Sequence, residues 1–125
     1  MLNAKNNHLL AEKLSSYNEK VVRQIIGFNY YVDTDDDYNV SNLEICFVLE
    51  PNTDRGRLKV LVKFSDVTGV RLNGIGKIIY LTGFEIIDNK KNGWDSGQRY
   101  YVHDYEDNKF EFYCRTIEIL SVEQI

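Results

Sequence analysis

The sequence predicts a mainly β protein: an antiparallel meander of about seven strands that forms a sandwich or a partly open barrel, with one short N-terminal α-helix. Three observations carry this prediction. Short segments alternate apolar and polar side chains, turn-forming residues separate them, and the 125 residues contain a single proline. The length and the 43% hydrophobic content fit one domain, residues 1–125, with the helix at about 4–17 and the β domain at about 20–120.

The N-terminal segment, residues 4–17, is predicted to be the helix. Asn3 can cap it, and Leu10, Leu14 and Tyr17 follow at spacings of four and three, which place them on one helical face. Such a short and polar helix is marginal in water on its own. We therefore expect it to pack against the β domain.

The first predicted strand covers residues 22–32, where the pattern changes to period two. Gly27 marks a place for a β-bulge or for the close approach of another backbone. Residues 33–39 follow as an acidic loop. Further along, a turn at residues 65–69 leads to a short strand at residues 70–72.

Residues 43–64 predict a β-hairpin with a defined register. Its apolar faces coincide when Leu49 lies opposite Leu58, because a slip of one residue would turn one strand inside out. The same register places Glu44 opposite Lys63, which is a stabilising cross-strand pair of opposite charges.

Residues 77–88 are apolar on both strand faces, which predicts a strand that is covered on both sides. A loop of residues 89–98 leads to the last hairpin, whose strands are residues 99–105 and 109–120. The apolar parity of the second strand changes after Arg115, which predicts a bulge there.

The register of the last hairpin follows from its apolar residues. Matching the apolar faces requires a three-residue loop with Asn108 in the left-handed conformation that such loops use. This register places Tyr101 opposite Tyr113 and His103 opposite Glu111 on the outward face.

Charge and composition exclude several classes of function. A net charge of −4 argues against nucleic-acid binding, which needs clustered Lys and Arg, but it favours capture of basic partners. No apolar run reaches the roughly 20 residues of a membrane span, and the first residues lack the apolar core of a signal peptide. We expect a cytoplasmic protein without membrane contact, in which Cys46 and Cys114 are free thiols on opposite strand faces.

Residues 33–44 nearly match a calcium-binding loop. Acidic residues stand at positions one, three and five, and Glu44 stands at position twelve. However, Tyr38 replaces the glycine that the sharp turn requires, the flanking segments are strands, and Glu44 is expected to face Lys63. We therefore predict no metal and no cofactor, and a calcium module is kept as an alternative.

His103 is the one candidate for acid–base chemistry, because it faces outward near Glu111 and a His–Glu pair can tune a proton acceptor. No serine, thiol or second carboxylate is placed by the sequence to complete a catalytic site. We predict no catalytic residue and no enzyme. A small-ligand-binding β-barrel, or a minor enzyme that uses His103, is the alternative.

Tyrosine residues give the strongest sign of a recognition surface, because Tyr, Trp and Arg dominate the energetics of protein interfaces. They gather on the outward face of the last hairpin and around the acidic loop, and the only tryptophan lies in the loop of residues 89–98. Coverage of this face by another element is the competing interpretation. The predicted partner-binding residues are Asp33, Asp35, Asp36, Asp37, Tyr38, Trp94, Tyr101, His103, Tyr105 and Tyr113.

Four segments of the chain, residues 62–74, 82–88, 93–94 and 100–114, resemble small uncharacterised bacterial proteins found near polymorphic or contact-dependent toxins, which look like dedicated immunity proteins. The likeness is one of pattern over about the last two-thirds of the chain, and it contains no catalytic motif. It implies a non-enzymatic inhibitor that binds and occludes one cognate toxin, and the net negative charge of the chain makes a basic toxin domain the expected protein partner.

Overall fold

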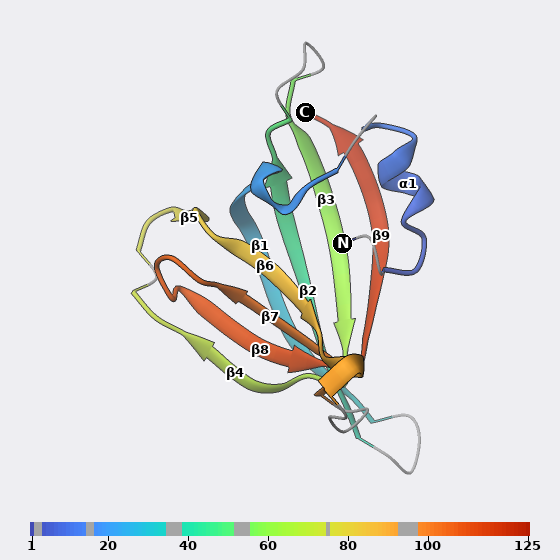
Figure 1. Ribbon diagram of the computed structural model, residues 1–125, viewed down its shortest axis with the longest axis vertical. Coiled ribbons are helices and arrows are strands. Elements are labelled where there is room, and N and C mark those ends of the chain that lie inside the picture. The colour runs from blue at the N-terminus through green and yellow to red at the C-terminus, as the bar shows by residue number, and fades with distance from the viewer. Residues whose placement is uncertain (2–3, 15–16, 35–38, 52–55, 75, 93–97) are drawn as a thin grey trace.

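The computed structural model describes residues 1, 4–14, 17–34, 39–51, 56–74, 76–92 and 98–125. Within these residues the chain forms nine strands in two open antiparallel sheets, which diverge from a shared corner (Figure 1). This confirms the predicted mainly β class, as two packed open sheets and not as a closed barrel.

The larger sheet has five strands in the order β5–β1–β2–β3–β9. These strands are β1 (Val22–Asp33), β2 (Val40–Leu49), β3 (Leu58–Ser65), β5 (Ile79–Tyr80) and β9 (Thr116–Gln124). The smaller sheet has four strands in the order β4–β8–β7–β6. They are β4 (Thr68–Leu72), β6 (Phe84–Asp88), β7 (Tyr100–Asp104) and β8 (Phe110–Cys114).

The register predicted for residues 43–64 is confirmed. Leu49 lies opposite Leu58 and Glu44 lies opposite Lys63 in the ladder between β2 and β3. Side chains of β3 alternate between buried and half-buried along the whole strand. The burial of alternate apolar residues therefore selected the register, as expected for a sheet with one buried face.

The register of the last hairpin is confirmed as well. Tyr101 lies opposite Tyr113 and His103 lies opposite Glu111 in the ladder between β7 and β8. Asn108 has a φ of 51°, which is the predicted left-handed conformation. The outward face of this hairpin is therefore built from the residues that the sequence predicts.

Two segments pass from one sheet to the other where the sequence predicts unbroken strands. The predicted bulge near Arg115 is wrong, because β8 ends just before this residue in the smaller sheet and β9 begins just after it in the larger sheet. Residues 77–88 are likewise divided between β5 in the larger sheet and β6 in the smaller sheet. Splitting these two predicted strands turns the expected seven or so into the nine observed.

The N-terminal helix is shorter than predicted. Helix α1 (His8–Ala11) has four residues and Asn7 as its N-cap. The backbone N–H of Lys5 donates to Ile117 and its carbonyl accepts the N–H of Ile119, so Lys5 pairs with β9 and is not part of the helix. Two 3₁₀-helices, η1 (Glu19–Val21) and η2 (Asn89–Asn92), complete the secondary structure of the described residues.

Phenylalanine rings from both sheets form the centre of the core. Phe64 of β3 meets Phe112 of β8 with ring centroids 4.9 Å apart, and Phe47 of β2 meets Phe84 of β6 at 5.2 Å. Both pairs are edge-to-face, a favourable geometry for aromatic rings. The two sheets therefore pack inner face against inner face, which leaves the outer face of the smaller sheet for other contacts.

Two further expectations concern the cysteines and the membrane. Cys46 and Cys114 are both free, and they lie in different sheets. Within the part of the chain that the structure describes, no helix combines the length and the apolar character that crossing a membrane requires.

Candidate functional site

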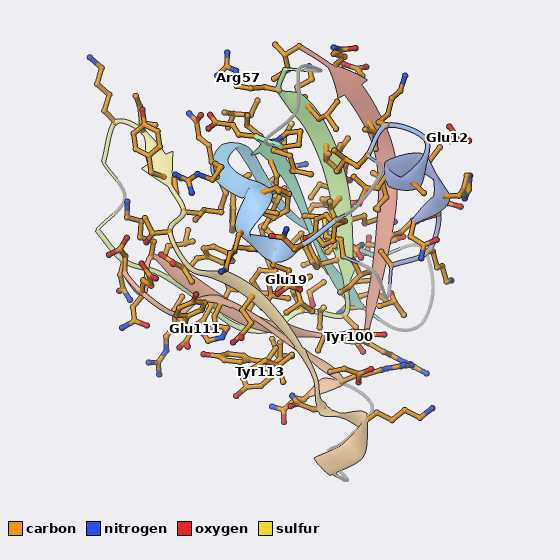
Figure 2. The ribbon with its side chains drawn as sticks, turned by 45° about the horizontal axis from the view of Figure 1, so that its top comes forward. Glu12, Glu19, Arg57, Tyr100, Glu111 and Tyr113 are labelled. Atoms are coloured by element: carbon orange, nitrogen blue, oxygen red, sulfur yellow. The ribbon has the colours of Figure 1, made fainter. Side chains whose placement is uncertain are left out.

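The outer face of the smaller sheet gathers aromatic and acidic side chains from three neighbouring strands. Alternate residues of β6, β7 and β8 point to this side, while their neighbours enter the core. Figure 2 shows Glu111 and Tyr113 on the side of the smaller sheet that faces away from the larger sheet. We define the aromatic–acidic face as Glu85, Tyr101, His103, Tyr105, Glu111 and Tyr113.

The aromatic rings of this face form a continuous row. The ring centroids of Tyr113 and Tyr101 are 4.9 Å apart, and those of Tyr101 and His103 are 4.5 Å apart in a stacked arrangement. Tyr105 extends the row, with its centroid 6.3 Å from that of His103. Cross-strand and same-strand spacing in a sheet place such rings in contact, so the row is a direct consequence of the β7–β8 register.

Two carboxylates accept hydrogen bonds along the row. The hydroxyl of Tyr101 donates to Oε2 of Glu111, whose other oxygen lies 3.5 Å from Nε of Arg71 on β4. Nε2 of His103 lies 2.8 Å from Oε1 of Glu85 on β6. The carboxylate that contacts His103 is therefore Glu85, and not Glu111 as the hairpin register alone suggests.

The face is open to solvent at one end and more enclosed in its middle. The side chain of Tyr105 is 50% exposed, whereas Tyr101, His103 and Tyr113 are half-buried by one another and by the sheet. Ile87 adds an exposed apolar side chain on the same side of β6. An exposed tyrosine beside ordered, half-buried rings suits a surface that binds another macromolecule.

Glu19 lies at the free edge of β6, beside this face. Its Oε2 accepts a hydrogen bond of 3.3 Å from the backbone N–H of Ile86. Burial raises the pKa of the Glu19 carboxyl above its ordinary value. Glu19 therefore occupies an outward backbone N–H at the edge of β6. Glu85 and His103 lie on the outer face and are not part of this contact.

Titration of Tyr101 provides a test of its contact with Glu111. Burial and the hydrogen bond to Glu111 raise the pKa of Tyr101 from 10.0 to about 12. A raised pKa stabilises the folded state fully below pH 10, and this contribution is lost as the pH rises towards 12.

We therefore expect the stability of Tyr101→Phe to fall less steeply with pH than that of the wild type over this range. Urea unfolding at a series of alkaline pH values measures the two slopes. Ultraviolet titration should also show that Glu111→Gln lowers the pKa of Tyr101. Equal slopes for Tyr101→Phe and the wild type would show that the folded state does not raise the pKa of Tyr101.

The acidic loop is only partly described. Asp33 is exposed at the end of β1, in the larger sheet, and is not part of the aromatic–acidic face. The other predicted binding residues of this loop, and the tryptophan, lie outside the described residues: Asp35, Asp36, Asp37, Tyr38 and Trp94. At the far end of the calcium-like segment, Glu44 accepts a hydrogen bond of 2.6 Å from the hydroxyl of Tyr31.

The sequence places five of the six residues of the aromatic–acidic face on the outward side of the last hairpin: Tyr101, His103, Tyr105, Glu111 and Tyr113. Glu85 is the member of the face that it does not place. Glu85 lies in a segment that is apolar on both faces, so the alternation of residues does not predict which face of the sheet its side chain takes. The β6–β7 register, which pairs Glu85 with His103, determines this face. Ile87 and Arg71, which lie beside the face, were not predicted there either.

Among the residues that the structure describes, no cluster of three or more His, Cys, Asp or Glu side chains could hold a metal ion. Comparison with known proteins found no matching family model, no similar curated protein and no similar solved structure.

Proposed function

We propose that this protein is a non-enzymatic binding protein and that its aromatic–acidic face binds a basic polypeptide. The observation that carries the proposal is the row of rings from Tyr113 through Tyr101 and His103 to Tyr105, flanked by the carboxylates of Glu85 and Glu111. The most concrete form of this function is an immunity protein that neutralises a cognate bacterial toxin in the cytoplasm of the producing cell.

The chemistry of the face favours a cationic partner. Tyrosine rings bury a large area and attract Lys and Arg side chains to their faces. Glu85 and Glu111 keep part of their side chains exposed, so each can accept a further hydrogen bond from a partner. The net charge of −4 would also accelerate the encounter with a basic protein.

The resemblance to immunity proteins gives this partner its class. An immunity protein needs a surface that occludes its toxin, and it needs no catalytic group. The acidic loop that begins at Asp33 would supply a second contact with a basic toxin domain, as the sequence predicts.

The alternative of a small-ligand pocket or a minor enzyme that uses His103 requires a cavity beside this residue. His103 lies on the outer face, while its strand neighbour Val102 enters a core filled by phenylalanine rings. The two sheets are open, so they enclose no barrel. These observations favour a binding surface over an internal ligand site.

Binding of the proteins encoded by the adjacent genes tests the proposal. Each purified product is titrated into the full chain by calorimetry at two salt concentrations. We expect one basic product to bind, more weakly at high salt because exposed charges are screened. Tyr105→Ala should weaken this binding by about tenfold or more, as expected for an interface hot spot.

The matched control is Tyr80→Ala. Tyr80 is 56% exposed on β5 of the larger sheet, close to the 50% of Tyr105, so both variants remove a similar exposed ring. The control should bind like the wild type. The proposal fails if no adjacent product binds, or if both variants lose affinity equally.

A further inference from the structure

β1 has a long stretch of edge that no other strand of the described residues covers. β2 pairs with it from Val22 to Asp33, but on its other side β5 pairs only with Gln24 and Ile25. Residues 28–32 therefore present one side of their backbone without a strand partner among the residues described. We call these five residues the open β1 edge.

The other sheet edges carry features that prevent pairing with another chain. The backbone of Lys5 bonds to β9 at Ile117 and Ile119, and the rest of β9 carries the charged Glu123. Glu19 accepts the outward N–H of Ile86 on β6. β4 has a register shift and the charged Arg71, and β5 is only two residues long. Charges, irregular register and short length are the usual ways in which proteins protect sheet edges.

The open β1 edge carries none of these features. Its sequence is Phe28-Asn29-Tyr30-Tyr31-Val32, without charge or proline, and its register with β2 is regular from Phe28 onward. Tyr30 is 53% exposed and Val32 is 44% exposed, although both share a strand face with the partly buried Phe28. A regular edge with exposed apolar side chains is a template for an added strand.

We propose that the open β1 edge pairs antiparallel with the same edge of a second copy of this chain, with Tyr30 on the two-fold axis. The two larger sheets then join into one continuous sheet. Such a contact is isologous, as in most homodimers, because the same residues contribute from both copies.

The register follows from the strand itself. In an antiparallel pair, opposite residues share a face, so Tyr30 opposite Tyr30 places Phe28 opposite Val32 and Asn29 opposite Tyr31. Phe28, Tyr30 and Val32, which share one strand face, then lie opposite Val32, Tyr30 and Phe28 of the second copy.

The boundaries of β1 select the same register. With Tyr30 on the axis, the strand end at Asp33 lies opposite Gly27, just short of Ile25, where β5 begins to pair. A shift of the axis to Asn29 would bring Asp33 opposite Ile25 and into β5. A shift to Tyr31 or Val32 would leave fewer paired residues.

The charge pattern of the open β1 edge is compatible with self-association. Each copy carries a net charge of −4, which opposes a general contact between copies. The open β1 edge contains no charged residue, and the register places Asp33 opposite a glycine. The pairing therefore brings no like charges directly opposite each other.

Sedimentation velocity of the full chain over a range of concentrations tests the proposal. An edge of five residues is small for an interface, so we expect a weak dimer that forms as the concentration rises. Tyr30→Lys and Tyr30→Glu should each weaken dimerisation at least about tenfold, because each sets like charges face to face. An equal mixture of the two variants should dimerise again, since a lysine then faces a glutamate.

Tyr80→Lys is the matched control, because Tyr80 is an exposed tyrosine on β5 outside the pairing. It should dimerise like the wild type. Hydrogen exchange of the wild type should show slower exchange in residues 28–32 at high concentration, which tests the contact even if a variant folds poorly. A monomer at all concentrations, a dimer insensitive to Tyr30→Lys, or a mixture that stays monomeric would overturn the proposal.

Discussion

Replacement of Phe64 by alanine is expected to lower the free energy of unfolding by about 3–5 kcal/mol, the range for truncating a fully buried phenylalanine. Phe64 is fully buried in β3. Its ring packs edge-to-face on Phe112 of the smaller sheet, with centroids 4.9 Å apart and planes at 74°, and it also meets Phe47 within its own sheet. Alanine would leave a cavity where the two sheets meet, and this cavity adds to the lost transfer free energy.

Urea unfolding followed by circular dichroism measures this loss. Leu120→Ala is the control, because Leu120 is an exposed apolar residue of β9 and its truncation should change stability by no more than about 0.5 kcal/mol. The loss in free energy of unfolding for Phe64→Leu should lie between those of the two alanine variants, since leucine retains most of the apolar volume. A loss below about 1 kcal/mol for Phe64→Ala would contradict its place at the junction of the sheets.

The hairpin registers could be predicted because both strands of each pair have one buried face. Leu49 and Leu58 must enter the same core, and this requirement alone places Glu44 opposite Lys63. The same reasoning placed Tyr101 opposite Tyr113. Local alternation is therefore sufficient where a short turn joins two paired strands that each have one apolar face.

The passages between sheets could not be predicted in this way. At Arg115 a change of apolar parity is equally consistent with a bulge inside one strand and with a crossing between two sheets. Only the position of the neighbouring strands decides between the two, and this position depends on contacts distant in sequence. Arg115 donates its backbone N–H to the carbonyl of Ser65, the last residue of β3, so this crossing lies beside the passage of the chain from β3 to β4 in the smaller sheet.

The aromatic part of the candidate site could be predicted because it lies in a single hairpin. Tyr101, His103 and Tyr113 belong to one hairpin, whose register is local. The pairing of His103 with Glu85 involves β6, which reaches β7 only after the loop that follows Asp88. A residue from a strand that is apolar on both faces carries no sequence signal for the side that it will take.

Replacement of Gly83 by alanine is expected to lower the free energy of unfolding by about 1–3 kcal/mol, the range for overpacking a close contact. A Cβ atom on Gly83 would lie 2.9 Å from the backbone nitrogen of Glu106 and 3.2 Å from Oδ1 of Asp104. The same glycine donates its N–H to Asp104 Oδ1 at 3.0 Å and accepts the N–H of Tyr105 at 2.9 Å. Alanine would force apart the segment that joins β5 to β6 and the turn that follows β7.

Gly76→Ala is the matched control, because no heavy atom lies within 4 Å of its Cβ position. It should leave stability unchanged or raise it slightly, since alanine restricts the unfolded chain more than glycine does. Urea unfolding of both variants measures the difference. Equal stability of Gly83→Ala and Gly76→Ala would contradict the prediction, because it would mean that the turn after β7 moves at no cost in free energy. Asp104 in this region is fully buried, and its carboxylate accepts the N–H of Gly83. Because Tyr105 follows in this turn, a loss of stability at Gly83 should also disorder the open end of the aromatic–acidic face.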